Sequence, residues 1–141
     1  LKIKELKKES KLIAINNYNF YNKFRPNKVT ILNTINKLND SKKIVLAIIG
    51  GNSEKEIRYN KSIEKLLKQN LENVNIMNFT SLLSIENSIK IISESDLYIG
   101  ANNGLGNTSQ MLGVKSIILF TKAEKIIKRK FSENSSFIIS N

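Results

Sequence analysis

The sequence predicts an α/β domain with a mostly parallel sheet covered by helices on both faces. Short apolar runs alternate four or five times with longer stretches in which apolar residues recur at helical spacing. Residues 44–49 are continuously apolar, which is typical of a strand buried on both faces. A chain of 141 residues corresponds to about one domain and is long enough to bury a single core.

The first predicted strand covers residues 12–16, and a polar loop over residues 17–26 follows it. Proline fits the first turn of a helix, so we expect Pro26 to begin one. The apolar positions that recur at helical spacing in this helix are Val29, Leu32, Ile35 and Leu38.

The second predicted strand covers residues 44–49 and ends at a turn over residues 50–52, which begins with two glycines. Residues 53–56 form a capping box, in which the Ser53 hydroxyl and the Glu56 carboxylate satisfy the first N–H groups of a helix. We expect this helix to end at about Asn70.

The second half of the chain continues the alternation. We expect strands over residues 74–77, 97–100 and 115–120, and residues 137–139 can add a last strand. Ser84 is expected to cap a further helix, with Ile85, Ile89 and Ile92 on its inner face.

This alternation, with right-handed crossovers, is typical of a Rossmann-like three-layer domain. We predict one such domain over residues 12–141, preceded by a charged connecting segment over residues 1–11. Because the chain begins with Leu1 rather than methionine, we expect it to be a piece of a longer protein.

The composition excludes several kinds of chemistry. The chain has no cysteine and no histidine, so it forms no disulfide and holds neither a histidine-dependent triad nor a zinc site of the usual type. We expect no metal and no cofactor. No apolar run is long enough to cross a bilayer and no signal peptide is visible, so the expected location is cytoplasmic.

The net charge of +11 makes a nucleic-acid-binding α/β domain an alternative. Most lysines, however, are scattered over the expected outer faces of helices without interleaved aromatic residues, as on an ordinary solvated surface. We therefore expect no nucleic-acid partner. A denser basic cluster is either solvated or contacts a phosphorylated acceptor or anionic lipid at the inner membrane face, and it comprises Lys122, Lys125, Lys128, Arg129 and Lys130.

The turn over residues 101–107 is the best candidate for a site. It lies between a buried strand and a helix, so free backbone N–H groups and the positive end of the helix dipole point outward, where an anion binds well. The residues expected to line this site are Asn102, Asn103, Gly104, Leu105, Gly106 and Asn107. A plain turn without a ligand remains the alternative, because the spacing matches neither the dinucleotide nor the P-loop pattern.

Two residues in other loops are expected to join this turn. The loops after the first, second and fourth strands share one edge of a parallel sheet, where ligands bind in such folds. Glu54 either accepts hydrogen bonds from ribose hydroxyls or only favours the helix dipole. Lys23 either neutralises a phosphate or is simply solvated. Together these loops predict a pocket for a nucleoside diphosphate.

The sequence resembles the family 9 glycosyltransferases, which include the heptosyltransferases of the lipopolysaccharide core. Residues 13–16 resemble the strand that opens the carboxyl-terminal half of these enzymes. Residues 23–26 resemble the K-x-W-P segment, with Arg25 in place of tryptophan, and residues 48–54 resemble the G-G-x-x-E turn. The similarity extends over most of the chain.

Around the donor site, residues 95–100, 112–114 and 117–120 are similar to the family's strand, helix and strand. The family signature at this place is D-[ST]-G-x-x-H. Here Gly104 is kept, whereas Asn102 and Asn107 replace the acid and the histidine.

The resemblance implies the second half of a two-domain GT-B enzyme that binds a nucleotide sugar such as ADP-heptose. It also implies inversion at the sugar without a metal, in lipopolysaccharide or other bacterial surface glycan assembly. The acceptor site and the catalytic base would lie in a missing amino-terminal half, so no catalytic residue is assigned here. The alternative is a non-catalytic or degenerate nucleotide-binding module.

Overall fold

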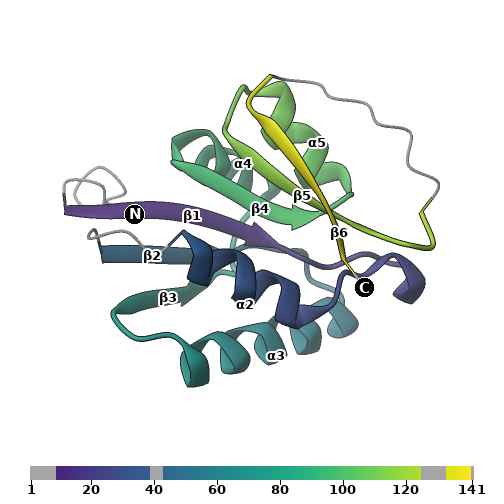
Figure 1. Ribbon diagram of the computed structural model, residues 1–141, viewed down its shortest axis with the longest axis horizontal. Helices are drawn as coiled ribbons and strands as arrows, with labels where there is room; N and C mark the ends of the chain where they lie inside the picture. Colours follow the sequence, from purple (N-terminus) through teal and green to yellow (C-terminus); the bar gives the residue numbers. More distant parts are fainter. Residues whose placement is uncertain (1–8, 39–42, 125–132, 141) are drawn as a thin grey trace.

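The computed structural model describes residues 9–38, 43–124 and 133–140. Its strands form one parallel sheet in the order β3-β2-β1-β4-β5-β6 (Figure 1). The strands are β1 (Ser10–Asn16), β2 (Lys43–Ile48), β3 (Val74–Asn78), β4 (Leu97–Ala101), β5 (Ser116–Thr121) and β6 (Ser135–Ser140). The predicted α/β class and the predicted last strand are thereby confirmed.

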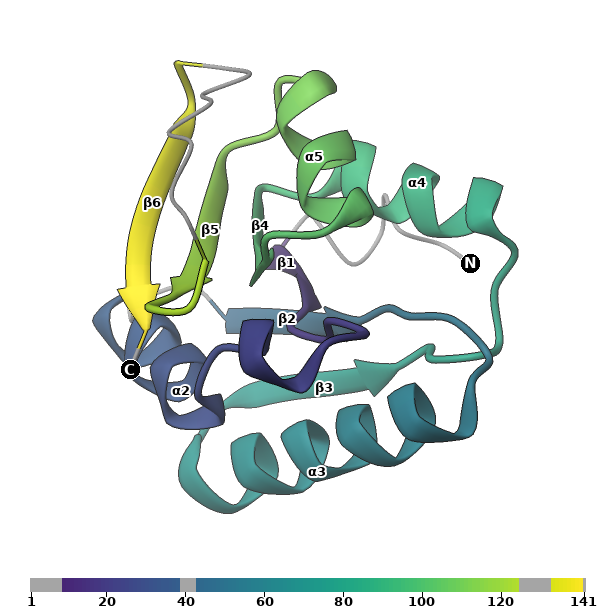
Figure 2. The same cartoon turned by 90° about the vertical axis from the view of Figure 1, so that its right-hand side faces the viewer.

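Helices cover both faces of this sheet. They are the short 3-10 helix η1 (Asn22–Phe24), α2 (Lys28–Lys37), α3 (Glu54–Asn70), α4 (Ile85–Glu94) and α5 (Gly104–Met111). Figure 2 shows α2 and α3 on one side of the sheet and α4 and α5 on the other. Each side has its own apolar core, with Ile31 and Leu67 in the first and Ile92 and Tyr98 in the second. Within the described part of the chain, no helix combines the length and apolar character needed to cross a bilayer.

The direction of the chain along the sheet reverses at β1. The chain passes from β1 to β2 and β3 on one side, then crosses to β4 on the other side of β1. In open α/β sheets the crevice at such a reversal, outside the carboxyl ends of the strands, is where ligands bind. Because all strands are parallel, the loops after β1, β2 and β4 do share one edge, as predicted.

The start of α2 differs from the prediction. Asn27 is the N-cap and its side chain accepts a hydrogen bond from the backbone N of Val29 at 2.9 Å. Pro26 is buried just outside the helix, so the prediction that it lies in the first turn was wrong. An asparagine side chain can satisfy a free N–H group at this end, whereas proline cannot. Val29, which was expected on the apolar face of this helix, is 48% exposed, whereas Ile31 is buried.

Further differences concern α4 and the capping box of α3. Ile85 begins α4 and is 66% exposed, because the buried stripe starts one turn later at Ser88 and continues to Ile91 and Ile92. Ser53 caps α3 as predicted and accepts from the backbone N of Glu56. The Glu56 carboxylate does not complete the box, since it accepts from the Asn16 side chain at 3.1 Å.

The first strand begins earlier than predicted. Ser10 and Lys11 pair with Lys43 and Ile44 of β2, so they belong to the sheet rather than to a connecting segment. Residues 1–8 lie outside the described part of the chain, and so does most of the predicted basic cluster, residues 125–130. Lys122, the described member of that cluster, is exposed.

Candidate functional site

Asn16 joins the three loops at the carboxyl edge of the sheet. It is the last residue of β1 and is 2% exposed. Its Nδ2 donates to the backbone O of Ile49 at 2.7 Å and to the Glu56 carboxylate at 3.1 Å, on the β2 side. Its Oδ1 accepts from Asn103 Nδ2 at 2.7 Å, on the β4 side. Asn16 therefore sets the relative positions of these loops.

Asn103 caps the helix that follows β4. Its Oδ1 accepts from the backbone N of Gly106 at 2.9 Å, which satisfies one N–H group of α5. Its Nδ2 donates to Asn16 and also to the backbone O of Tyr18 at 2.8 Å. The Asn103 side chain thus holds the turn in place, and its amide hydrogens are already used within the protein.

The N–H groups of Gly104 and Leu105 are the ones that α5 leaves for a ligand. Gly106 N is capped by Asn103, and Asn107 N makes the first helical bond to the Asn103 carbonyl at 3.0 Å. No acceptor within residues 9–38, 43–124 and 133–140 receives the N–H of Gly104 or Leu105. Two such donors at the positive end of a helix favour an anion.

The two glycines of this turn have different environments. A Cβ added at Gly104 would meet no atom within 4 Å, so the space outside this residue is open. A Cβ added at Gly106 would lie 2.8 Å from the carbonyl oxygen of Ala101. Gly106 therefore permits close packing of α5 on β4, while Gly104 leaves access from outside. The Leu105 side chain packs against the core.

Asn102 faces a carboxylate from the next loop. Its Nδ2 donates to Glu124 Oε2 at 2.9 Å, and its backbone O accepts from Asn19 Nδ2 at 3.2 Å. The other oxygen of Glu124 accepts from the backbone N of Thr121 at 3.0 Å. Sequence reasoning missed Glu124, because the residues between Asn102 and Glu124 give no sign that the two loops meet.

Lys23 lies in η1, within the loop after β1. Its side chain is exposed, and its Nζ lies 5.0 Å from the centre of the Phe24 ring. Its backbone O accepts from the Thr121 hydroxyl at 2.9 Å, which ties this loop to the end of β5. The lysine is thus held near the carboxyl edge with its ammonium group in solvent.

The first turn of α3, which follows the glycine turn after β2, holds two carboxylates with different surroundings. Glu54 is the first residue of α3 and is exposed, as a ligand-facing residue must be. Glu56 is half-buried, and a Cβ at Gly50 would lie 2.6 Å from its Oε2. The glycine turn thus leaves space for the Glu56 side chain. Burial and the charge of Glu56 raise the pKa of the fully buried Tyr98 hydroxyl.

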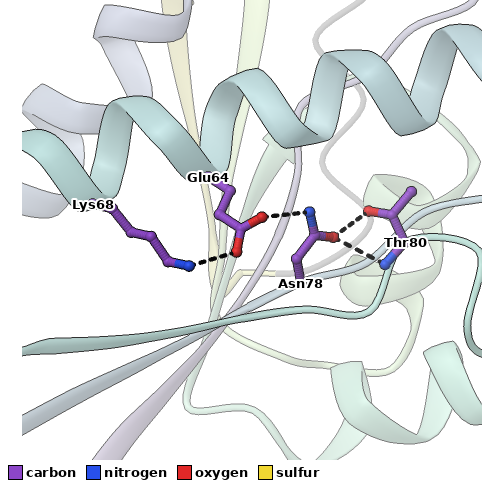
Figure 3. A network of polar contacts seen from close by, with 4 residues as sticks. All are labelled: Glu64, Lys68, Asn78 and Thr80. Atoms are coloured by element: carbon purple, nitrogen blue, oxygen red, sulfur yellow. Dashed lines mark hydrogen bonds and ion pairs between the residues drawn. The ribbon is translucent and has the colours of Figure 1, made fainter.

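A polar network continues this edge to β3 (Figure 3). Thr80 donates from its backbone N to Asn78 Oδ1 at 3.0 Å, and Asn78 Nδ2 donates to Glu64 of α3 at 3.2 Å. Lys68 pairs with Glu64 at 2.9 Å. Burial opposes ionisation of Glu64, but the hydrogen bonds from Lys68 and Asn78 outweigh it and lower the pKa of this carboxyl. The network fixes α3 on the loop after β3.

A separate groove of about 720 Å³ lies between the start of α2 and α3. Arg25, Lys28, Lys65 and Tyr59 are among its lining residues, and the predicted site residues are not. Burial raises the pKa of Tyr59 to about 12. Within the described residues, no group of three or more His, Cys, Asp or Glu side chains is placed to hold a metal ion.

The fold and the site edge define the class as a Rossmann-like α/β domain. Its fold is similar to that of the ADP-heptose LPS heptosyltransferase II of E. coli, with a TM-score of 0.73, 14% identity and 93% of this chain covered. It is also similar to a family 9 glycosyl transferase from Veillonella parvula, with a TM-score of 0.69, 14% identity and 97% coverage. A third similar structure is the E. coli heptosyltransferase WaaC with ADP, with a TM-score of 0.69, 12% identity and 96% coverage.

This chain spans 37–39% of the length of these three proteins. No protein-family model matches it. No curated protein matches it either. The shared fold is that expected from the resemblance to the carboxyl-terminal half of family 9 enzymes.

Proposed function

We propose that this chain is the nucleotide-sugar-binding half of a family 9-like glycosyltransferase. The observation that carries the proposal is the pair of unused N–H groups at Gly104 and Leu105, in front of open space at the point where the sheet reverses. A diphosphate provides the negative oxygens that such donors bind. The similar structures include one with ADP and one with ADP-2-deoxy-2-fluoro heptose.

The other residues of the edge have complementary roles in this proposal. Lys23 neutralises a phosphate, and Glu54 accepts hydrogen bonds from ribose hydroxyls. Asn102 and Asn107 flank the diphosphate as neutral groups, while Asn103 and Gly106 keep the turn in shape. The resulting donor is a nucleotide sugar such as ADP-heptose.

The proposal extends to the protein as a whole. An amino-terminal half supplies the acceptor site and the catalytic base, and transfer inverts the sugar without a metal. The setting is lipopolysaccharide or other bacterial surface glycan assembly in the cytoplasm. A peripheral contact with the inner membrane face involves Lys122 and the basic residues after it. This chain covers 39% of the length of the two E. coli heptosyltransferases.

Calorimetric titration with ADP, UDP and GDP, beside an assay for sugar transfer, tests the core of this proposal. We expect the isolated chain to bind a nucleoside diphosphate and to transfer no sugar, because no group assigned as catalytic base lies within it. Transfer by the isolated chain contradicts the proposed division of labour. Absence of binding to all three nucleotides contradicts the proposed site.

A degenerate, non-catalytic nucleotide-binding module is the second candidate. It is favoured by Asn102 and Asn107, since neither amide titrates as the signature acid and histidine do. Transfer of the sugar from ADP-heptose to an acceptor, by this chain joined to its amino-terminal half, separates the two. An active transferase forms the bond between sugar and acceptor and releases ADP, whereas a module binds the nucleotide without turnover.

A further inference from the structure

We propose that Glu124 is a sugar-reading residue of the donor site, whose carboxylate accepts hydrogen bonds from hydroxyl groups of the transferred sugar. The inference rests on the proposed function. It assigns a role to Glu124 and divides the donor site into a phosphate end and a hydroxyl end. It follows from the contacts of Glu124 with Asn102 and Thr121.

Glu124 lies at the same edge as the phosphate-binding turn. It follows β5, which is paired with β4 through Leu119 and Ala101 near their carboxyl ends. One of its oxygens accepts from Asn102 Nδ2, in the loop after β4, at 2.9 Å, and the other from the backbone N of Thr121, the last residue of β5, at 3.0 Å. These bonds fix the carboxylate beside the turn that carries Gly104.

The contact also determines how the Asn102 amide is turned. A carboxylate can only accept hydrogen bonds, so the Asn102 atom that faces it must be the donor Nδ2. Asn102 Oδ1 accepts no hydrogen bond within the described part of the chain. Glu124 and Asn102 Oδ1 together present acceptor atoms, beside the second N–H of the Asn102 amide.

Acceptors of this kind select hydroxyl groups and repel phosphate. An ionised carboxylate offers about four lone-pair sites, and the three donors from the Asn102 amide and from the backbone N and hydroxyl of Thr121 occupy only part of them. No ion pair neutralises Glu124 among residues 9–38, 43–124 and 133–140, and its side chain is half-exposed. The site is thus divided into a phosphate end at Gly104 and Leu105 and a hydroxyl end at Glu124.

The test compares two probes of equal charge. ADP-heptose and the β-methyl ester of ADP carry the same diphosphate diester, but the ester has no sugar hydroxyls at that end. We expect the unmodified chain to bind ADP-heptose about tenfold more tightly, as for one hydrogen bond to a charged acceptor. In Glu124→Gln this preference should fall to about twofold or less, with affinity for the methyl ester within about twofold of the starting value.

A matched control is Glu72→Gln, because Glu72 is an exposed carboxylate between α3 and β3 at the other end of the sheet. It should leave both affinities unchanged. Glu124→Asp keeps the charge on a shorter side chain, so an intermediate preference is expected. If Glu124→Gln does not fold, Glu124→Asp carries the test alone, and a preference equal to that of the unmodified chain then contradicts the inference.

Each remaining outcome overturns the inference. Equal loss of both affinities in Glu124→Gln makes Glu124 a residue that only holds the loop. If Glu124→Gln keeps the full preference for ADP-heptose over the methyl ester, other groups contact the sugar hydroxyls. If the unmodified chain has no such preference, no group of this chain binds those hydroxyls. Binding of neither probe by the unmodified chain instead removes the proposed function, and the inference with it.

Discussion

Asn103 Nδ2 donates to Asn16 Oδ1 at 2.7 Å, and this bond joins the loop after β4 to the end of β1. The two residues are 87 positions apart in the sequence. The bond crosses the place where the sheet reverses direction, so it holds the start of α5 against the loop after β1. The orientation of the Gly104 and Leu105 N–H groups depends on this pair.

Replacing the Asn103 amide by a carboxylate should therefore destabilise the fold. Asn103→Asp keeps the acceptor that caps Gly106 but loses the donors to Asn16 and Tyr18 and places negative charge against their oxygens. We expect a loss of about 2 kcal/mol in the free energy of unfolding, measured with urea. Asn107→Asp is the control, since the Asn107 side chain has no hydrogen bond in the described part, and it should change stability by less than about 0.5 kcal/mol. Equal stability of the two variants contradicts the account.

The two glycines of the turn should respond in opposite ways. Gly104→Val adds a side chain to open space, so folding should be retained while nucleotide affinity falls by about 2 kcal/mol. Gly106→Ala places its Cβ against the Ala101 carbonyl, so it should lower the free energy of unfolding by about 2 kcal/mol. Calorimetry and urea denaturation of both variants check this. A folded Gly104→Val chain with unchanged affinity would show that the turn is only structural.

The alternation of strands and helices was predictable because each element has a local pattern. Residues 44–49 are continuously apolar, and Ser53 and Ser84 each precede a helix and cap it. The edge that bears the loops then follows from the parallel topology alone. Boundaries were less predictable where two local patterns competed, as at Pro26 and Asn27.

The interior of the site was not predictable from local pattern. Asn103 was expected to face a ligand, but its amide is bonded to Asn16, a partner that only the tertiary fold brings near. Glu56 fits a capping box by spacing, yet its carboxylate accepts a hydrogen bond from the buried Asn16 side chain, which only the tertiary fold brings near. Glu124 is one more carboxylate in the sequence, and its contact with Asn102 depends on the pairing of β4 with β5.

Restoring the signature acid should weaken nucleotide binding. Asn102→Asp places a second carboxylate beside Glu124 in place of a donor, and the added charge at residue 102 repels a diphosphate. We expect a loss of about 1 kcal/mol in binding free energy. Asn102→Asp should also lower the free energy of unfolding, because two carboxylates then face each other without a donor. Adding Glu124→Gln to Asn102→Asp supplies a donor from the other side and should recover much of this stability. Tighter nucleotide binding by Asn102→Asp alone contradicts this account.

The Glu64 network should make stability depend on pH. The folded chain lowers the pKa of this carboxyl, so its contribution is present above the unfolded pKa and is lost as the pH falls through the folded value. Between about pH 5 and pH 3 the unmodified chain should therefore lose more stability than Glu64→Gln does. Urea denaturation across this range measures the difference. Parallel pH profiles for the two chains are the result that contradicts it.

The central claim is that the first N–H groups of α5 bind a diphosphate. A nuclear magnetic resonance titration of the 15N-labelled chain with ADP tests it most directly, because each backbone amide reports separately. We predict that the amides of Gly104 and Leu105 shift most at saturation, while Gly113, beyond the other end of α5, stays unchanged. Saturation with ADP that leaves both the Gly104 and Leu105 amides unmoved contradicts the claim.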